Sequence, residues 1–222
     1  MAFETALRLV EVGLALAILQ RGAEHLRHDV WLFVPQMVCA GMVLAGFAVP
    51  VALFGAWAFG VAQLWQFRGP YNGGADKMLL LGLTCATVAT TVPPAAELAL
   101  AYLAVQLVLS YVVSGWVKLR NPEWRSGQAL AEVFAFSIYP ISTATRAWAS
   151  HTTALRRASW AVIGFEVAFP LALVSAPILW IALAGAATFH LLNAWMFGLN
   201  RFVWAWLPAF PALIWLQSRL LG

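Results

Sequence analysis

Length, composition and charge exclude a soluble globular protein. The chain has 222 residues, of which 63% are hydrophobic and 10% are charged, whereas soluble domains carry about 25% charged residues. So few polar groups cannot cover a surface that faces water, which indicates an integral membrane protein. The net charge of +4 is spread along the chain and does not indicate a nucleic-acid partner.

Eight apolar segments predict an all-α fold, a polytopic membrane helix bundle in one domain over residues 1–222. A spanning helix needs about 20 apolar residues. The first segment contains Arg8 and Glu11, which a one-turn offset could pair on one face, and no cleavable signal is expected there. The predicted spans cover about 5–21, 30–47, 50–67, 77–92, 95–118, 154–175, 177–197 and 201–218.

The long polar connections between these spans all fall on one side of the membrane. That side holds 11 of the 13 basic residues, and the positive-inside rule would make it cytoplasmic. The connection from Lys118 to Arg157 is too long for a plain loop. Its segment GQALAEVFAF, residues 127–136, predicts an amphipathic helix that either re-enters the bundle or lies on the membrane surface.

Lys118 ends an apolar helix and shares one helical face with other polar side chains. Tyr111, Ser114 and Lys118 follow the spacing i, i+3, i+7. Because lipid offers no hydrogen-bond partners, this face should point into the bundle. A desolvated lysine can be neutral near pH 7 and act as a base toward a weak acid such as a quinol. The alternative is a lysine that reaches the membrane surface, where headgroups satisfy it.

A second polar face carries His190, Asn193 and Phe197, again at i, i+3, i+7. An ionisable side chain inside a span is a candidate functional group. Glu166 lies mid-span in the preceding helix, so the two antiparallel helices should bring Glu166 and His190 level with each other. Such a pair could relay protons, or it could be the least costly way to bury both groups.

The segment FRGPYNGGADK, residues 67–77, predicts a turn that leaves backbone N–H groups free to contact an anion or a polar ring substituent. Asn72 is the candidate contact, and Arg68 could pair with Asp76. The alternative is a tight connection between two spans. Cys39 and Cys85 lie in apolar runs, and no spacing of ligand residues indicates a metal site.

Three segments, in the same order, match the pattern of a known family. The lysine segment SGWVKL is followed by PEW, which contains Trp124, and then by a glycine. The later segment reads FHLLNAWMFGLNRF, and Asn72 precedes both. This arrangement resembles the vitamin K-dependent γ-carboxylases and their bacterial relatives, the horizontally transferred transmembrane (HTTM) domain proteins.

The resemblance implies a chemistry for these residues. Lys118 matches the lysine that deprotonates reduced vitamin K, after which oxygen converts the quinol anion into a base that removes a glutamate γ-proton before carbon dioxide adds. His190 matches a residue that lines that site, and we expect both Lys118 and His190 to be catalytic. The expected contacts to a reduced, vitamin K-like quinone are Tyr111, Ser114, Asn193, Asn72 and Trp124.

Two features depart from the family pattern. Gly73 follows Asn72 where the family has a histidine, and the chain ends at Gly222 directly after its last predicted span, where the carboxylases continue into a large extramembrane part. The resemblance also places the basic side in the periplasm, whereas the charge rule places it in the cytoplasm, so the orientation stays open.

Two functions follow from the sequence. One is a quinol-, oxygen- and carbon dioxide-using carboxylase-like lyase in a bacterial inner membrane, with Lys118 as base. The other is a non-catalytic transmembrane subunit or assembly factor of a larger membrane redox or photosynthetic complex. A transporter ranks last because no inverted repeat is visible. The expected partners are membrane lipids, a lipophilic quinone and other membrane subunits, with no nucleic acid.

Overall fold

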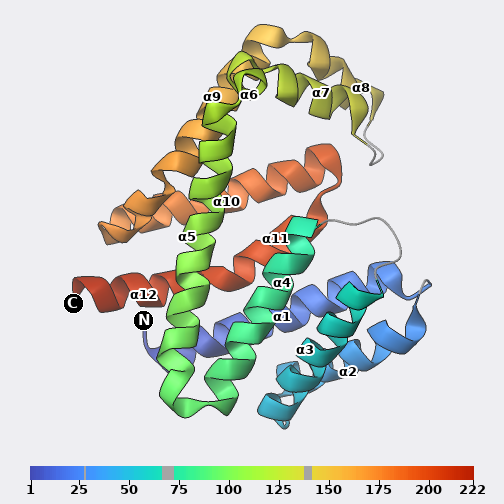
Figure 1. Cartoon of the computed structure of the whole chain (residues 1–222), viewed down its shortest axis with the longest axis vertical. Helices are drawn as coiled ribbons and strands as arrows, with labels where there is room; N and C mark the ends of the chain where they lie inside the picture. Colours follow the sequence, from blue (N-terminus) through green and yellow to red (C-terminus); the bar gives the residue numbers. More distant parts are fainter. Residues whose placement is uncertain (28, 67–72, 138–141) are drawn as a thin grey trace. The chain divides into compact units, whose positions relative to one another are not determined.

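The computed structural model describes residues 1–27, 29–66, 73–137 and 142–222, and almost all of them are helical. No strand occurs within these ranges, which confirms the all-α fold (Figure 1). The chain divides into two compact units: unit 1 comprises Met1–Val105 with Arg201–Gly222, and unit 2 comprises Gln106–Asn200. That residues 1–222 act as one domain stays a prediction.

Unit 1 joins the N-terminal helices to the C-terminal ones. In chain order it contains α1 (Phe3–His25), α2 (Val30–Ala45), α3 (Val49–Trp65), α4 (Gly73–Thr91), the 3-10 turn η1 (Pro93–Ala95), the first part of α5 (Ala96–Arg120), α11 (Asn200–Trp206), η4 (Leu207–Ala209) and α12 (Phe210–Leu221). Helix α1 packs against α2, α4 and α12, and it buries an apolar stripe that includes Val10, Leu14 and Ile18. The pair that the sequence allowed on α1 also forms, with 3.1 Å between a guanidinium nitrogen of Arg8 and Oε2 of Glu11.

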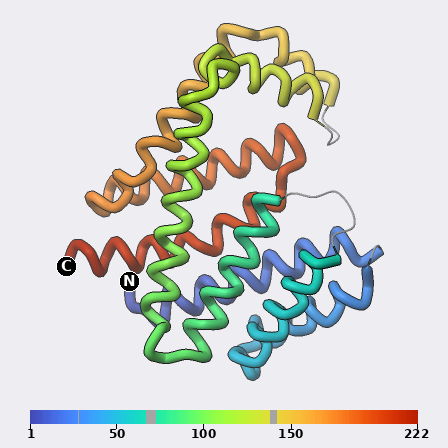
Figure 2. Tube along the Cα trace, in the orientation of Figure 1, coloured from blue at the N-terminus to red at the C-terminus, as the bar shows by residue number. Residues whose placement is uncertain are grey.

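Unit 2 carries the candidate site. Its helices are the second part of α5, then α6 (Pro122–Ser126), α7 (Gln128–Phe136), α8 (Thr143–Ala147), η2 (Trp148–Ser150), α9 (Thr152–Ala168), η3 (Phe169–Leu173) and α10 (Ala176–Phe197). Figure 2 follows the chain from α9 through η3 into α10. The predicted amphipathic helix forms as α7: Phe134 is buried, whereas Gln128 and Glu132 are exposed. Phe134 packs with Leu155 and Phe197 in one apolar cluster.

Within the described residues, each predicted span coincides with helical structure, but two spans are interrupted at prolines. Pro170 falls where α9 gives way to η3, and Pro208 falls between α11 and α12, because a proline inside a helix removes a backbone hydrogen bond. Among the described residues, two helices are long and apolar enough to cross a membrane, Pro93–Arg120 and Ala176–Phe197, and α2 and α3 are apolar but shorter. The count of about eight spans is therefore not confirmed.

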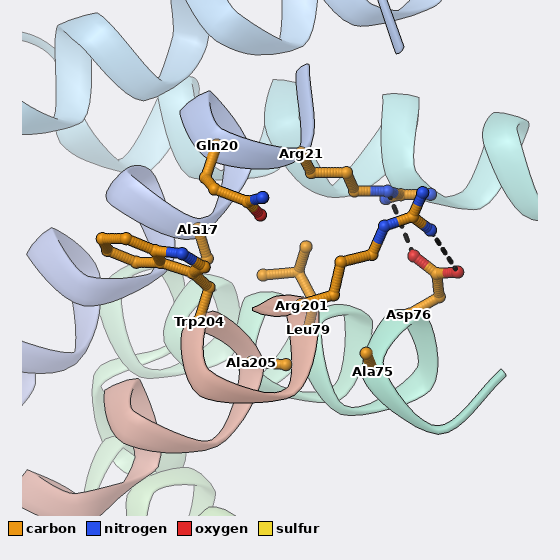
Figure 3. A pocket seen from close by; sticks show the side chains of 9 residues that line it. All are labelled: Ala17, Gln20, Arg21, Ala75, Asp76, Leu79, Arg201, Trp204 and Ala205. Atoms are coloured by element: carbon orange, nitrogen blue, oxygen red, sulfur yellow. Dashed lines mark ion pairs between the residues drawn. The ribbon is translucent and has the colours of Figure 1, made fainter. Parts of the chain in front are cut away.

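A buried ionic network fastens one end of unit 1. Asp76 on α4 forms an ion pair with Arg21 on α1, with 3.1 Å between Nε and Oδ1. A guanidinium nitrogen of Arg201 on α11 lies 3.9 Å from Oδ2 of the same carboxylate (Figure 3). These side chains line a cavity of about 10 Å³, which has room for one water molecule. The sequence offered Arg68 as the partner of Asp76, but Arg68 lies outside the described residues. The two arginines that Asp76 does meet are distant in sequence, which is why spacing did not reveal them.

His25 belongs to the same network in its neutral form. Its Nδ1 lies 3.0 Å from the carbonyl oxygen of Arg21, and its Nε2 lies 2.7 Å from a guanidinium nitrogen of Arg201. Because a carbonyl only accepts and a guanidinium only donates, Nδ1 carries the hydrogen and Nε2 accepts. Burial lowers the pKa of His25, and the neighbouring charges of Arg201 and Arg21 lower it further.

We predict that acid destabilises unit 1 through His25. The pKa of His25 is lower in the folded than in the unfolded chain. Neutral His25 therefore contributes fully to the stability of the folded state above the unfolded-state pKa of about 6.5, and this contribution is lost as the pH falls below that pKa. The measurement is the apparent melting temperature of detergent-solubilised protein between pH 8 and pH 5. His25→Gln should flatten this pH dependence, and His151→Gln, at an exposed histidine, should leave it unchanged. An equally steep loss in His25→Gln would contradict the assignment.

Candidate functional site

The polar face of α5 points into unit 2, as its spacing predicts. Tyr111 is buried, Ser114 is half-buried, and the Lys118 side chain is 14% exposed. Ser110, one turn earlier, turns its hydroxyl back to the carbonyl of Leu107. The face therefore presents a hydroxyl, a phenol and an ammonium group to the helices that pack against it.

Glu166 on α9 is the partner of Lys118. Its two carboxylate oxygens lie 2.7 and 2.6 Å from Nζ of Lys118, and the hydroxyl of Ser114 accepts a third bond at 2.7 Å. The Glu166 side chain is only 3% exposed. All three donors of this ammonium are satisfied within the protein. The headgroup-satisfied lysine considered from the sequence is therefore not what the structure shows.

Gly115 makes this ion pair possible by letting α9 approach α5. A Cβ atom placed at Gly115 would lie 2.8 Å from Cβ of Glu166 and 2.8 Å from the backbone nitrogen of Val167, closer than real Cβ atoms come to their neighbours. The glycine therefore brings the two backbones together at the position where the short glutamate side chain must reach Lys118. The segment SGWVK thus supplies the hydroxyl, the close contact and the ammonium within five residues.

Trp124 covers the ammonium from a short helix. Asn121 caps α6 by accepting a hydrogen bond from the backbone nitrogen of Glu123 at 2.8 Å, and Pro122 occupies its first turn. The Trp124 ring centre lies 5.2 Å from Nζ of Lys118, within cation–π range. The carbonyl of Trp124 accepts a bond from the buried hydroxyl of Ser159, which fixes α6 against α9.

His190 meets Tyr111 two turns deeper along α5. The Tyr111 hydroxyl lies 2.8 Å from Nε2 of His190, and both residues are buried. The ring of Tyr111 also stacks on Phe169 at a centroid distance of 4.0 Å. The sequence pattern had paired Glu166 with His190. The structure instead brings Glu166 to Lys118 and His190 to Tyr111, because α5 passes beside both α9 and α10 and offers each group a closer partner.

The remaining candidate contacts are less closely tied to this centre. Asn193 is half-buried on α10, three residues beyond His190. Asn72 lies outside the described residues. The structure therefore brings together Tyr111 with His190, and Ser114 and Trp124 with Lys118. It adds Glu166 as the direct partner of the lysine; the sequence had singled out this carboxylate within an apolar span but had assigned it to His190.

Comparison with known proteins assigns the family. Residues 85–217 match the model of the HTTM domain. The chain belongs to the HTTM family. The match covers every helix of unit 2, within which Lys118, Glu166 and His190 lie, and it confirms the resemblance seen in the sequence. No curated protein and no solved structure matches the chain.

We predict that Gly115→Ala separates α5 from α9. The added methyl group has no room against Glu166 and Val167, and overpacking of this kind costs about 1–3 kcal/mol. The measurement is the apparent melting temperature in detergent. Gly164→Ala is the matched control, because a Cβ atom at Gly164, on α9 itself, meets nothing within 4 Å. Equal melting temperatures for the two variants would show that the close contact is not required.

We also predict that the charges of Lys118 and Glu166 are coupled. Lys118→Met leaves a buried carboxylate and Glu166→Gln leaves a buried ammonium, and breaking a buried pair costs about 3–5 kcal/mol. The double variant removes both charges and should be more stable than the sum of the single losses implies. Additive losses in the melting temperature would mean that the two groups do not interact.

Proposed function

We propose that this HTTM protein is a quinol-dependent, carboxylase-like membrane enzyme whose proton-accepting centre is the Lys118–Glu166 pair. The observation that supports this most is the geometry of the pair: the ammonium of Lys118 is bound by a carboxylate and a hydroxyl and lies under an indole, and the Lys118 side chain as a whole is 14% exposed. A proton-accepting pair needs access for its substrate, and we infer that the exposed part of this side chain marks an open edge of the site.

The residues at this edge suit a flat aromatic alcohol. The Trp124 ring offers an apolar face, and Lys118 with Ser114 offers polar groups at the depth where a lipid-soluble ring could insert. Tyr111 is enclosed by its contacts with Phe169 and His190, so we assign it to the wall of the site and not to a direct contact. A reduced quinone would supply an acidic hydroxyl and the electrons that the related carboxylases pass to oxygen.

The pairing changes which group acts as the base. Lys118 is held as an ammonium, so it has no lone pair with which to accept a proton in this arrangement. Glu166 is the base: its carboxylate accepts the proton from the quinol hydroxyl. Lys118 stays charged beside the quinol oxygen that has lost the proton. The pair thus takes up one proton overall and leaves a cation to stabilise the new negative charge, which is the larger part of such catalysis. His190 would act one step away, by orienting Tyr111 in the wall.

The proposal also places the chain in a bacterial inner membrane with about eight spans. The helices α2 and α3 support this, because both are apolar and both leave large side chains exposed: Trp31 is 86% and Trp65 is 89% exposed. These two residues stand at the start of α2 and the end of α3, as tryptophans do at a membrane surface.

We predict that quinol-dependent oxygen uptake by protein in liposomes depends on both members of the pair. The probe is vitamin K hydroquinone, with incorporation of labelled bicarbonate as a second readout. Lys118→Met and Glu166→Gln should each lower the rate at least about a hundredfold, since a positioned base contributes 10²–10⁴-fold. Asp76→Asn, which breaks a buried ion pair in unit 1, should keep the rate per folded molecule.

A second candidate is the non-catalytic subunit or assembly factor, and one observation favours it. Lys118 has all its donors satisfied within the chain, as a structural ion pair would. Native mass spectrometry of protein extracted from its own membranes separates the two. A bound species with the mass of a quinone supports the enzyme function. A stoichiometric complex with other subunits and without a quinone, together with no quinol-dependent oxygen uptake, would support the subunit function instead.

A further inference from the structure

The end of unit 2 that carries α6 and the start of α9 is strongly basic. Residues 120–157 contain five arginines against two glutamates and no lysine or aspartate, a net charge of +3. Arg146 is used within the fold, where it donates to the carbonyls of Ala135 and Ser137 at the end of α7. Three of the others, Arg125, Arg156 and Arg157, are exposed, and we call them the basic surface.

The backbone brings these three arginines to one end of the unit. Gly127, which takes a φ of +86°, packs so closely that a Cβ atom there would lie 2.7 Å from Cα of Arg156. Arg125 is two residues before this contact, on α6, and α6 lies beside the first turns of α9 (Figure 1). The hydrogen bond from Ser159 to the carbonyl of Trp124 holds the two segments together.

The arginines of the basic surface have no carboxylate partner among the described residues. Among the described residues, no carboxylate lies within ion-pair distance of Arg125, Arg156 or Arg157. Two of the arginines sit in the first two turns of α9, which has no acidic residue in its first turn and no side-chain cap at His151. Cations near the positive end of a helix are unfavourable unless an anion or solvent compensates them.

Aromatic side chains around this end indicate what the anion belongs to. Trp116, Trp148 and Trp160 are between 43% and 50% exposed, and Phe136 at the end of α7 is 78% exposed. The guanidinium of Arg120 lies over the Trp116 ring, 4.9 Å from its centre. Exposed tryptophans beside arginines are typical of the level of lipid headgroups, and anionic headgroups attract basic segments next to a spanning helix.

We propose that Arg125, Arg156 and Arg157 form a binding surface for the headgroups of anionic phospholipids. The exposed aromatic side chains lie against the lipid at the membrane surface, and the three guanidiniums bind phosphate oxygens there. Arginine suits this role because its fork of N–H groups binds phosphate in a bidentate manner. The surface is independent of the proposed enzyme function, because none of its residues contacts Lys118 or Glu166 in the described structure.

The test is lipid competition followed by native mass spectrometry. Protein in detergent receives equal amounts of phosphatidylglycerol and phosphatidylcholine, and the lipids that stay bound are counted. Wild-type protein should retain more phosphatidylglycerol than phosphatidylcholine. In R125Q/R156Q/R157Q the ratio of bound phosphatidylglycerol to bound phosphatidylcholine should fall at least about tenfold, because each basic residue near the surface strengthens the binding of anionic lipid. Equal melting temperatures verify that the variant is folded.

A second triple variant provides the matched control. R27Q/K77Q/R219Q removes the same three charges from exposed positions of unit 1, and it should keep the preference. An equal loss in both triple variants would show a general effect of net charge and would overturn the proposal, as would the absence of any preference in wild-type protein. The proposal would also be overturned if soluble polyglutamate displaced phosphatidylglycerol and this displacement depended on the same three arginines, because the partner would then be an acidic peptide.

Discussion

The ion pair between Lys118 and Glu166 is the interaction on which the candidate site depends. Neither charge is stable alone among apolar helices, because an isolated ion loses its hydration and gains nothing in exchange. The pair is stable only because α5 and α9 run close together at Gly115, which brings the carboxylate within 2.7 Å of the ammonium. Ser114 takes the third donor, and Trp124 covers the group. The ion pair thus joins α5 to α9, and Trp124 places α6 over it.

The same requirement separates the charges of the chain into two kinds. Each of three carboxylates that are buried among the helices has a basic partner: Glu11 pairs with Arg8, Asp76 with Arg21, and Glu166 with Lys118. Where arginines stand at the exposed end of unit 2, no carboxylate meets them in the described structure. A buried charge needs its partner within the protein, whereas an exposed charge can be compensated by solvent or, as we propose for these arginines, by lipid headgroups.

The two polar contacts of α5 have different consequences for chemistry. Tyr111 and His190 form a neutral pair enclosed by Phe169 and suited to hold a wall in place. Lys118 and Glu166 form a charged pair, and in the proposed function protonation of the carboxylate leaves the ammonium of Lys118 as a cation beside the new negative charge of the substrate. In the function that we propose, the carboxylate of Glu166 accepts the proton, because the ammonium of Lys118 has no lone pair with which to do so.

The sequence by itself determined the class of the protein and the polar faces. Its hydropathy predicted helices at positions where helices form, and the spacing of Tyr111, Ser114 and Lys118 predicted one shared face, because the period of an α-helix fixes which residues lie together. The segments around Lys118 and His190 were enough to suggest the HTTM family. Only the tertiary structure decided the partners: Glu166 for Lys118 and Tyr111 for His190, where the sequence had joined Glu166 to His190. Helical periodicity fixes the direction of a side chain but not which distant helix it meets, and that choice depends on a close approach such as the one at Gly115.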